Sequence, residues 1–372
     1  MRIGMPKEIK PDEYRVGLVP ASVREAVHHG HEVLVQRGAG TVIGLLDEDY
    51  ERAGATLVED AEAVFTGAEL IVKVKEPQKP EIAMLREGQI LFTYLHLAPD
   101  PELTRALMAT GATCIAYETV TNDRGGLPLL APMSEVAGRM SVQAGAHCLE
   151  IEQGGRGMLL GGVPGTLPAK VVVLGGGVVG TNAARVALGM EADVTILDLS
   201  LPRLSDLDLH FGPALNTAFS TVDMVHRLVA EADLVVGAVL VPGGETPKLI
   251  TEAMVRDMKK GSVIVDVAVD QGGCAETTRP TTHSNPTFTI HEVVHYCVAN
   301  MPGAVARTSA FALNNATLPF TLAMADQGVE AALARDHHLL AGLNVYQGRI
   351  TYEAVARGTG EPYTDPRRLL GR

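Results

Sequence analysis

The sequence predicts an α/β protein with two doubly wound parallel-sheet domains, one of which is inserted into the other. Short runs of β-branched residues alternate with helical stretches along most of the 372 residues, and this alternation calls for parallel sheets covered by helices. A glycine-rich turn at residues 175–180 directly follows one of these runs. The residues after about 305 are too few for a domain of their own, so we expect them to return to the first domain.

The first part of the chain contains five candidate strands. Helical stretches at residues 21–29 and 101–110 lie between them. Because strands joined through helices run parallel, we expect one sheet with helices on its faces. The predicted strands are residues 2–5, 32–36, 70–75, 90–95 and 112–117.

The turn has the Gly-x-Gly-x-x-Gly spacing of a dinucleotide-binding unit. It reads Gly175-Gly-Gly-Val-Val-Gly180, between the strand 171–174 and a helical run. Gly175 permits the tight turn, Gly177 lets the backbone approach a pyrophosphate, and Gly180 lets helix and strand pack closely. The free N–H groups at the start of that helix favour phosphate. We therefore predict a Rossmann-type cofactor domain.

Asp198 indicates which dinucleotide is bound. It ends the strand that follows the glycine turn, where an acid accepts hydrogen bonds from the adenosine ribose and repels a 2′-phosphate. Arg203 lies nearby and is the one feature that could meet a phosphate instead. We expect NAD as the cofactor.

The cofactor domain is predicted to contain six strands flanked by two long helices. The helices are expected at about 134–152 and 305–325, both rich in small residues. We predict a substrate-binding, catalytic domain from residues 1–133 with 305–372, and an NAD-binding domain from 134–304, with the active site in the cleft between them. The predicted strands are residues 171–174, 194–197, 216–219, 234–238, 263–267 and 287–290.

Composition excludes several classes of partner. The 31 basic and 44 acidic side chains give a net charge of −13, which argues against nucleic acid or an anionic membrane. No apolar run approaches the ~20 residues of a spanning helix, and the N-terminus lacks the apolar core of a signal peptide. The four scattered cysteines are typical of reduced thiols in the cytoplasm. We expect a soluble cytoplasmic protein.

Three titratable residues follow predicted strands: Lys75, His96 and Asp270. Ligands of parallel sheets bind at these carboxyl ends, and a lysine, a histidine and an aspartate are suited to proton transfer beside a hydride acceptor. Each has a plainer interpretation. Lys75 could be solvated, His96 could be bonded to backbone, and Asp270 could cap the glycine turn that follows it. Their coincidence at three strand ends favours a catalytic site.

Arg15 is a further candidate, in a polar loop after the first strand. A guanidinium binds a substrate carboxylate through two parallel hydrogen bonds. The residues alone favour a surface arginine paired with Glu13 or Asp12.

His291-Glu-Val-Val-His295 matches the zinc-peptidase pattern His-Glu-x-x-His. Zinc chemistry needs a sustained helix that carries both histidines on one face, with a third ligand. We expect only a short helix here, within the last strand–helix unit, and no metal.

Several motifs together resemble the family that alanine dehydrogenase shares with the nicotinamide-binding component of proton-pumping transhydrogenase. The resemblance covers essentially the full chain. Its carriers are Met5-Pro-Lys-Glu-Ile-Lys10, Arg15-Val-Gly-Leu-Val-Pro20, Leu159-Leu-Gly-Gly-Val-Pro-Gly165, the glycine turn, residues 237–243, Asp270-Gln-Gly-Gly-Cys274 and Tyr296-Cys-Val-Ala-Asn-Met-Pro302.

The resemblance implies NAD-dependent deamination of L-alanine to pyruvate and ammonia, and the reverse reaction. It implies that Arg15 and Lys75 bind the substrate, that His96 and Asp270 are catalytic, and that the protein is a homo-hexamer. The cofactor residues it implies, together with those of the glycine turn, are Ser134, Gly175, Gly177, Val178, Val179, Gly180, Asp198, Arg203, Ser220, Val239, Leu240, Val267, Ala268, Val269, Asp270, Arg279, Val298, Ala299, Asn300 and Met301.

Other functions remain possible at this point. The nicotinamide-binding component of a transhydrogenase does not convert an amino acid, and His96 with the intact loop at Asp270 favours a dehydrogenase over it. A non-catalytic NAD sensor would not need the set of Arg, Lys, His and Asp. A related dehydrogenase for another amino acid, such as a lysine–oxoacid condensing enzyme, would share these residues.

Overall fold

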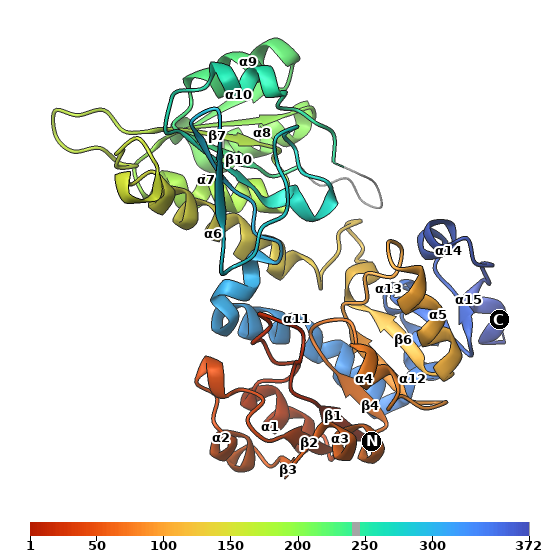
Figure 1. Cartoon of the computed structure of the whole chain (residues 1–372). Helices are drawn as coiled ribbons and strands as arrows, with labels where there is room; N and C mark the ends of the chain where they lie inside the picture. The colour runs from red at the N-terminus through yellow and green to blue at the C-terminus, as the bar shows by residue number, and fades with distance from the viewer. Residues whose placement is uncertain (240–245, 372) are drawn as a thin grey trace. The chain divides into compact units, whose positions relative to one another are not determined.

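A computed structural model describes residues 1–239 and 246–371, which form two compact units (Figure 1). Unit 1 comprises Met1–Met133 and Val305–Arg372, and unit 2 comprises Ser134–Ala304. Each unit contains one mostly parallel sheet. The predicted α/β class with two parallel sheets is confirmed. No described helix has the length and apolar character needed to cross a membrane.

Unit 1 contains an eight-stranded sheet in the order β15-β14-β6-β5-β4-β1-β2-β3. Six strands are parallel, while β14 pairs antiparallel with β6 and β15 pairs antiparallel with β14. The strands are β1 (Arg2–Met5), β2 (Glu32–Gln36), β3 (Thr56–Val58), β4 (Leu70–Val72), β5 (Ile90–Thr93), β6 (Thr113–Ala116), β14 (Leu343–Tyr346) and β15 (Arg349–Ile350).

The prediction for this sheet was incomplete. It missed β3, β14 and β15, which are only two to four residues long, and therefore missed the antiparallel edge. The helices of unit 1 are α1 (Pro20–His28), α2 (Asp47–Arg52), α3 (Ala61–Gly67), α4 (Lys79–Ile82), α5 (Pro101–Thr110), α11 (Ala306–Gln327), α12 (Val329–Arg335), α13 (His337–Ala341), α14 (Glu353–Thr359) and α15 (Pro366–Leu369), with 3-10 turns at η1 (Thr41–Ile43) and η2 (Tyr117–Thr119).

Unit 2 contains a seven-stranded sheet in the order β12-β13-β11-β10-β7-β8-β9. All its strands are parallel except β12. The strands are β7 (Lys170–Leu174), β8 (Asp193–Asp198), β9 (Leu215–Phe219), β10 (Leu234–Gly237), β11 (Val263–Asp266), β12 (Thr287–Ile290) and β13 (Val293–Tyr296). The helices are α6 (Ala131–Cys148), α7 (Val178–Gly189), α8 (Leu201–Phe211), α9 (Val222–Glu231) and α10 (Glu252–Asp257), with 3-10 turns at η3 (Ile151–Gln153), η4 (Gly212–Ala214), η5 (Val267–Gln271) and η6 (Met301–Val305), the last of which reaches into unit 1.

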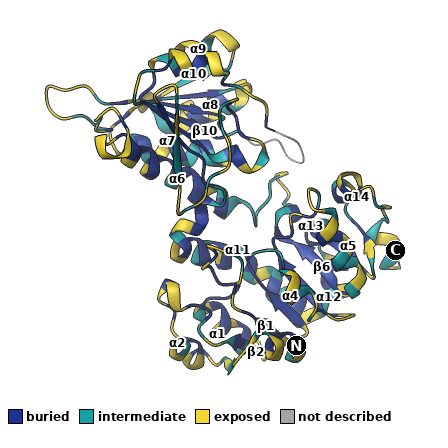
Figure 2. Ribbon diagram, viewed as in Figure 1, coloured by how far each residue is buried: buried dark blue, intermediate teal, exposed yellow. Residues whose placement is uncertain are grey.

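Three neighbouring strands of the unit 2 sheet, β11, β10 and β7, are buried (Figure 2). Val171 and Val173 of β7 belong to a core that includes residues of α6 and α7. Val172 and Leu174 belong to a second core with residues of α9 and α10. Because both faces are covered, these strands are continuous apolar runs without polar alternation, which is why they are recognisable in the sequence.

Two predictions about the end of unit 2 were wrong. Residues 287–290 were expected to form a sixth parallel strand, but β12 pairs antiparallel with β13. The short helix expected after it is absent, because His291 and Glu292 both have positive φ (50° and 60°) and form a two-residue hairpin turn. The strand that lies parallel to β11 is β13, which contains His295.

Candidate functional site

The glycine turn in unit 2 has the geometry of a phosphate-binding loop. Gly175 has φ of 100°, and a Cβ on it would lie 2.8 Å from the carbonyl oxygen of Ala238. A Cβ on Gly180 would lie 1.8 Å from the carbonyl oxygen of Gly175. A Cβ on Gly177 would meet nothing within 4 Å, so the backbone is open to a ligand at the residue that precedes α7. The N-terminus of this twelve-residue helix can therefore accept a pyrophosphate.

Asp198 and Arg203 are both hydrogen-bonded to residues of this turn. The Asp198 carboxylate accepts the N–H of Gly176 at 2.7 Å and the N–H of Ser200 at 2.8 Å. The Arg203 guanidinium donates to the carbonyl oxygen of Gly176 and to the hydroxyl of Thr181, each at 2.6 Å. Arg203 is thus fixed against the turn, and the acid at the end of β8 lies beside it.

Most of the other cofactor residues implied by the resemblance follow the carboxyl ends of parallel strands, where ligands of such sheets bind. Ser220 follows β9, and its N–H donates to the carbonyl oxygen of Asp198 at 3.1 Å. The guanidinium of Arg279 lies 4.4 Å from the centre of the Phe288 ring. Leu240 lies outside the described residues. Ser134 is in the first turn of α6, Val178 and Val179 begin α7, Val239 follows β10, Val267, Ala268 and Val269 form η5 after β11, and Val298, Ala299, Asn300 and Met301 follow β13.

In unit 1, Arg15 is buried, with 2% of its surface exposed. Its guanidinium donates to both carboxylate oxygens of Glu13, at 2.7 and 2.6 Å. Burial acts to raise the pKa of Glu13, but the hydrogen bonds and charge of Arg15 outweigh it and the pKa lies below its usual value. The pairing with Glu13 suggested by the sequence is present, but the arginine is not on the surface.

Lys75 lies three residues beyond the end of β4, and its backbone is held on both sides. Its N–H donates to the Glu8 carboxylate at 3.4 Å, and its carbonyl oxygen accepts the Thr93 hydroxyl at 2.9 Å. Burial and then the charge of Arg15 lower the pKa of the Lys75 ammonium. Because the charge of Arg15 contributes to this shift, the two cations are close enough to interact electrostatically.

His96 lies three residues beyond β5 in a conformation that is uncommon for a residue with a side chain. Its φ is 51°, and strain of this kind is often found at functional sites. The Glu118 carboxylate accepts the His96 N–H at 2.6 Å. The imidazole stacks on Tyr94, with ring centres 5.9 Å apart, and its Nδ1 lies 3.6 Å from Glu76 Oε2. The side chain is 48% exposed, so it remains accessible to a substrate.

Asp270 lies in η5 of unit 2 and is exposed, whereas Arg15, Lys75 and His96 lie in unit 1. The buried Asp266, not Asp270, caps this loop. Its carboxylate accepts the N–H groups of Ala268 at 3.1 Å and Cys274 at 2.7 Å. The sequence analysis did not identify Asp266, although an acid that ends an apolar strand before Gly272-Gly273 could have indicated it. Because Asp266 accepts these N–H groups, capping of the loop does not account for Asp270.

The zinc-peptidase pattern does not form a zinc site. His291 lies in the hairpin turn and contacts Glu252 at 2.8 Å. His295 is buried in β13, with Nε2 2.8 Å from the Thr277 hydroxyl. The two histidines are therefore on a turn and a strand, not on one face of a helix.

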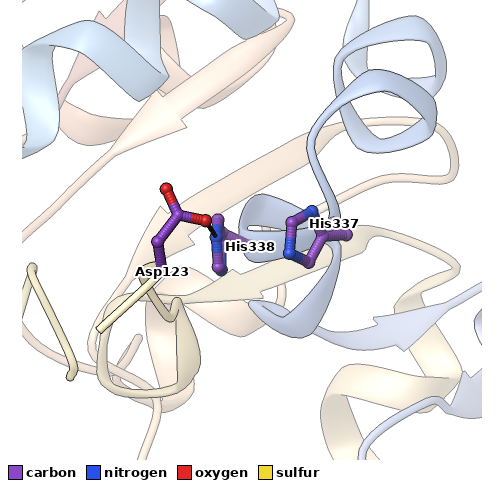
Figure 3. A group of neighbouring side chains, drawn as sticks. All are labelled: Asp123, His337 and His338. Carbon is purple, nitrogen blue, oxygen red and sulfur yellow. Dashed lines mark hydrogen bonds and ion pairs between the residues drawn. The ribbon is translucent and has the colours of Figure 1, made fainter. Parts of the chain in front are cut away.

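Within the described residues, one group of three side chains has ligand atoms within 4.8 Å of one another, namely Asp123, His337 and His338 (Figure 3). Both ring nitrogens of His338 already have protein partners. Nε2 lies 2.9 Å from Asp123 and Nδ1 lies 2.8 Å from the Thr121 hydroxyl. These contacts connect the segment after η2 to α13, so hydrogen bonding within the protein accounts for the group.

Comparisons with known proteins agree along the whole chain. Residues 4–137 match the model of the alanine dehydrogenase/PNT N-terminal domain, and residues 141–353 match that of the C-terminal domain. An alanine dehydrogenase of Halomonas elongata is 60% identical over 371 residues, which cover all of both chains. A solved structure of L-alanine dehydrogenase superposes with a TM-score of 0.94 at 52% identity, over 97% of this chain and 99% of that chain.

A more distant solved structure is a transhydrogenase from Sinorhizobium meliloti. Its TM-score is 0.84 at 25% identity, over 94% of this chain and 100% of that chain. Both family models and the full-length relatives thus point the same way, and the chain belongs to the alanine dehydrogenase/PNT family.

Proposed function

We propose that this protein is an NAD-dependent alanine dehydrogenase, which converts L-alanine to pyruvate and ammonia and catalyses the reverse amination. The observation that carries the proposal is the 60% identity to an alanine dehydrogenase over the whole of both chains. This match extends over both units. The site residues Arg15, Lys75, His96 and Asp270 are all present.

Unit 2 is the NAD-binding domain in this proposal. Gly177 leaves room for the pyrophosphate, and Asp198 presents its carboxylate where the adenosine ribose is expected. Because the Arg203 guanidinium is hydrogen-bonded to Gly176 and Thr181, it serves the turn and not a 2′-phosphate, which favours NAD. When bound, NAD accepts the hydride from the α-carbon of alanine.

Unit 1 is the substrate-binding and catalytic domain. The Arg15 guanidinium binds the alanine carboxylate, and Glu13 fixes its orientation through two hydrogen bonds. Lys75 donates a hydrogen bond to the carbonyl oxygen of pyruvate. Burial and the charge of Arg15 lower its pKa, so its ammonium is a more acidic hydrogen-bond donor than that of an ordinary lysine.

His96 moves the proton. As the hydride leaves, the alanine ammonium releases one proton to solvent, which gives an iminium. Water attacks the iminium carbon while His96 accepts one proton of that water, which gives a carbinolamine. Asp270 stabilises the cationic nitrogen. His96 then returns its proton to the nitrogen and takes up the hydroxyl proton as the C–N bond breaks, so that ammonia leaves and pyruvate remains.

The surface of unit 2 supports a homo-oligomer, which we propose to be a hexamer. The segment 150–168, drawn in yellow to yellow-green in Figure 1, contains four apolar residues that are largely exposed: Ile151 (66%), Leu159 (65%), Val163 (56%) and Leu167 (84%). Large apolar patches on soluble proteins mark interaction sites.

The cysteines and the net charge support the proposed location and partners. All four cysteines are free and buried, which supports a reducing, cytoplasmic location. The net charge of −13 opposes nucleic acid and membrane partners.

The test is nicotinamide reduction with a panel of amino acids. We expect alanine-dependent reduction of NAD to NADH, followed at 340 nm, and little or no reduction of NADP to NADPH. Oxidation of NADH with lysine and an oxoacid, without alanine-dependent reduction of NAD, would identify a different amino-acid dehydrogenase. NADH binding without reduction by any amino acid would instead favour the nicotinamide-binding component of a transhydrogenase, the activity suggested by the more distant structural relative, or a non-catalytic sensor.

A further inference from the structure

Glu76, the residue after Lys75, has one carboxylate oxygen that is buried without a hydrogen bond among the described residues. Its Oε1 is paired with the Lys10 ammonium. Its Oε2 is buried and has no hydrogen-bond partner among the described residues. A buried acceptor without a partner costs about 1–3 kcal/mol, so such an atom calls for an explanation. The His96 imidazole supplies one, since its Nδ1 lies 3.6 Å from this oxygen.

The His96 ring is held so that Nδ1 faces Glu76. The Glu118 carboxylate fixes the backbone by accepting the N–H groups of Leu95 and His96, and the ring stacks on the buried Tyr94. Tyr94 is itself fixed, because its hydroxyl donates to the carbonyl oxygen of Leu129 at 2.6 Å. A small movement of the ring shortens the 3.6 Å separation to a hydrogen bond, as commonly happens when substrate binds.

We propose that Glu76 is the positioning residue for His96: it accepts Nδ1–H, fixes the imidazole tautomer, and thereby presents the Nε2 lone pair to the reacting water. This inference rests on the proposed function, in which His96 is the proton acceptor. A carboxylate that holds a catalytic histidine in one tautomer is an effective arrangement, because the wrong tautomer cannot accept the proton.

The charges around the pair agree with this role. Burial acts to raise the pKa of Glu76, but the close contacts with His96 and Lys10 outweigh it and bring the pKa to about 2. Glu76 therefore remains a carboxylate throughout the working range of an enzyme. The charged and titratable groups that face the pair are Lys10 from the segment after β1, Lys75 beside Glu76, Tyr94 from the segment after β5, and Glu118 from η2.

The test compares Glu76→Gln with two matched variants. Glu76→Gln keeps the shape of the side chain but removes the charge and can present an amide donor to Nδ1. Lys10→Gln removes the partner of the other oxygen and leaves the contact with His96. Glu102→Gln removes an acid from an exposed pair with Lys79 in the same unit.

We expect Glu76→Gln to lower kcat for alanine oxidation by about 10- to 100-fold, the range for partners that orient functional histidines, with the KM for NAD unchanged. In Lys10→Gln the contact between Glu76 and His96 remains, so kcat falls less than in Glu76→Gln. Glu102→Gln matches the wild type, and melting temperatures verify that all variants are folded.

A double-mutant comparison decides whether Glu76 acts through His96. In a His96→Ala background, Glu76→Gln has no further effect on kcat if the proposal is right. An equal loss in both backgrounds, or wild-type kcat in Glu76→Gln, overturns it. Failure of the proposed function would instead appear as a wild-type protein that does not reduce NAD with alanine.

Discussion

Individual residues differ in how far the sequence indicates their surroundings. Lys75, His96 and Asp270 were predicted as site residues because each lies where an apolar run ends, and ligands of parallel sheets bind at the carboxyl ends of the strands. The pairing of Arg15 with Glu13 was also predicted, since the two residues are neighbours in the chain. Glu76 and Asp266 were not predicted as partners, because they are ordinary acids in the sequence and only the folded backbone brings them to His96 and to the N–H groups of the η5 loop.

The role of His96 leads to a direct prediction. Replacing it by alanine removes the group that accepts the proton of water, and such acid–base help contributes about 10²–10⁴-fold to turnover. We expect kcat to fall by that factor while the dissociation constant of NADH, measured by fluorescence titration, is nearly unchanged. A variant with near-normal turnover would exclude His96 as the proton acceptor.

Lys75 gives a prediction for alkaline pH. Because burial and Arg15 lower its pKa, the ammonium loses its proton at a lower pH than the 10.5 of a free lysine. We expect the KM for pyruvate to rise on the alkaline side at a pH below that value, as the charged donor is lost. The arginine of the Lys75→Arg variant keeps its charge to higher pH. The KM of this variant for pyruvate should therefore not rise over the pH range in which that of the wild type rises.

At the scale of elements, burial decided what could be read from the sequence. Strands β7, β10 and β11 of unit 2 are buried and were predicted as apolar runs. By contrast β3 and β15 have three and two residues, too few for a periodic pattern. The β12–β13 hairpin was missed because its turn is His291-Glu292, which lacks the Asn-Gly or Asp-Gly that usually marks such a turn.

The glycine turn supports a paired prediction. A methyl group at Gly177 meets no protein atom, whereas one at Gly180 would lie 1.8 Å from the Gly175 carbonyl oxygen. We expect Gly177→Ala to weaken NADH binding with little change in the melting temperature of the free protein. Gly180→Ala should weaken binding and also destabilise the fold by about 1–3 kcal/mol. Equal stability of the two variants, measured by urea unfolding, would contradict this difference.

A buried side chain of helix α11, Asn314, is hydrogen-bonded to the segment that contains Arg15. The Asn314 amide oxygen accepts the N–H of Val19 at 2.8 Å, and its nitrogen donates to the carbonyl oxygen of Val16 at 3.2 Å. Asn314→Ala leaves both groups unsatisfied, which costs about 1–3 kcal/mol in unfolding free energy. The exposed neighbour Asn315 is the matched control. Its replacement by alanine should change stability by less than about 0.5 kcal/mol.

For the whole molecule, the predicted α/β architecture was confirmed because alternation of strands and helices is a property of the entire chain and does not depend on any one boundary. Assembly is not encoded in that alternation. It depends on which apolar side chains remain outside after folding, and the exposure of Leu159 and Leu167 is visible only in the structure.

The assembly proposal can be tested on these side chains. We expect the double variant Leu159→Asp/Leu167→Asp to sediment at a lower mass than the wild type, because two carboxylates would be buried in the contact. Leu209→Asp alters an equally exposed leucine on α8 (82% exposed) and should keep the wild-type mass. If the double variant sedimented like the wild type, the segment 150–168 would not be part of the contact.

The pairing of β6 with β14 has a consequence for biosynthesis. Residues 113–116 cannot pair with residues 343–346 until the latter have been synthesised, so the first unit cannot complete its sheet until translation is nearly finished. Every strand of the second unit is contained within residues 170–296 and can leave the ribosome and fold before that. Because chains generally fold domain by domain as they emerge, the order of folding should be the reverse of the order in which the two units begin. The unfinished first sheet is then the part that most needs protection by chaperones during synthesis.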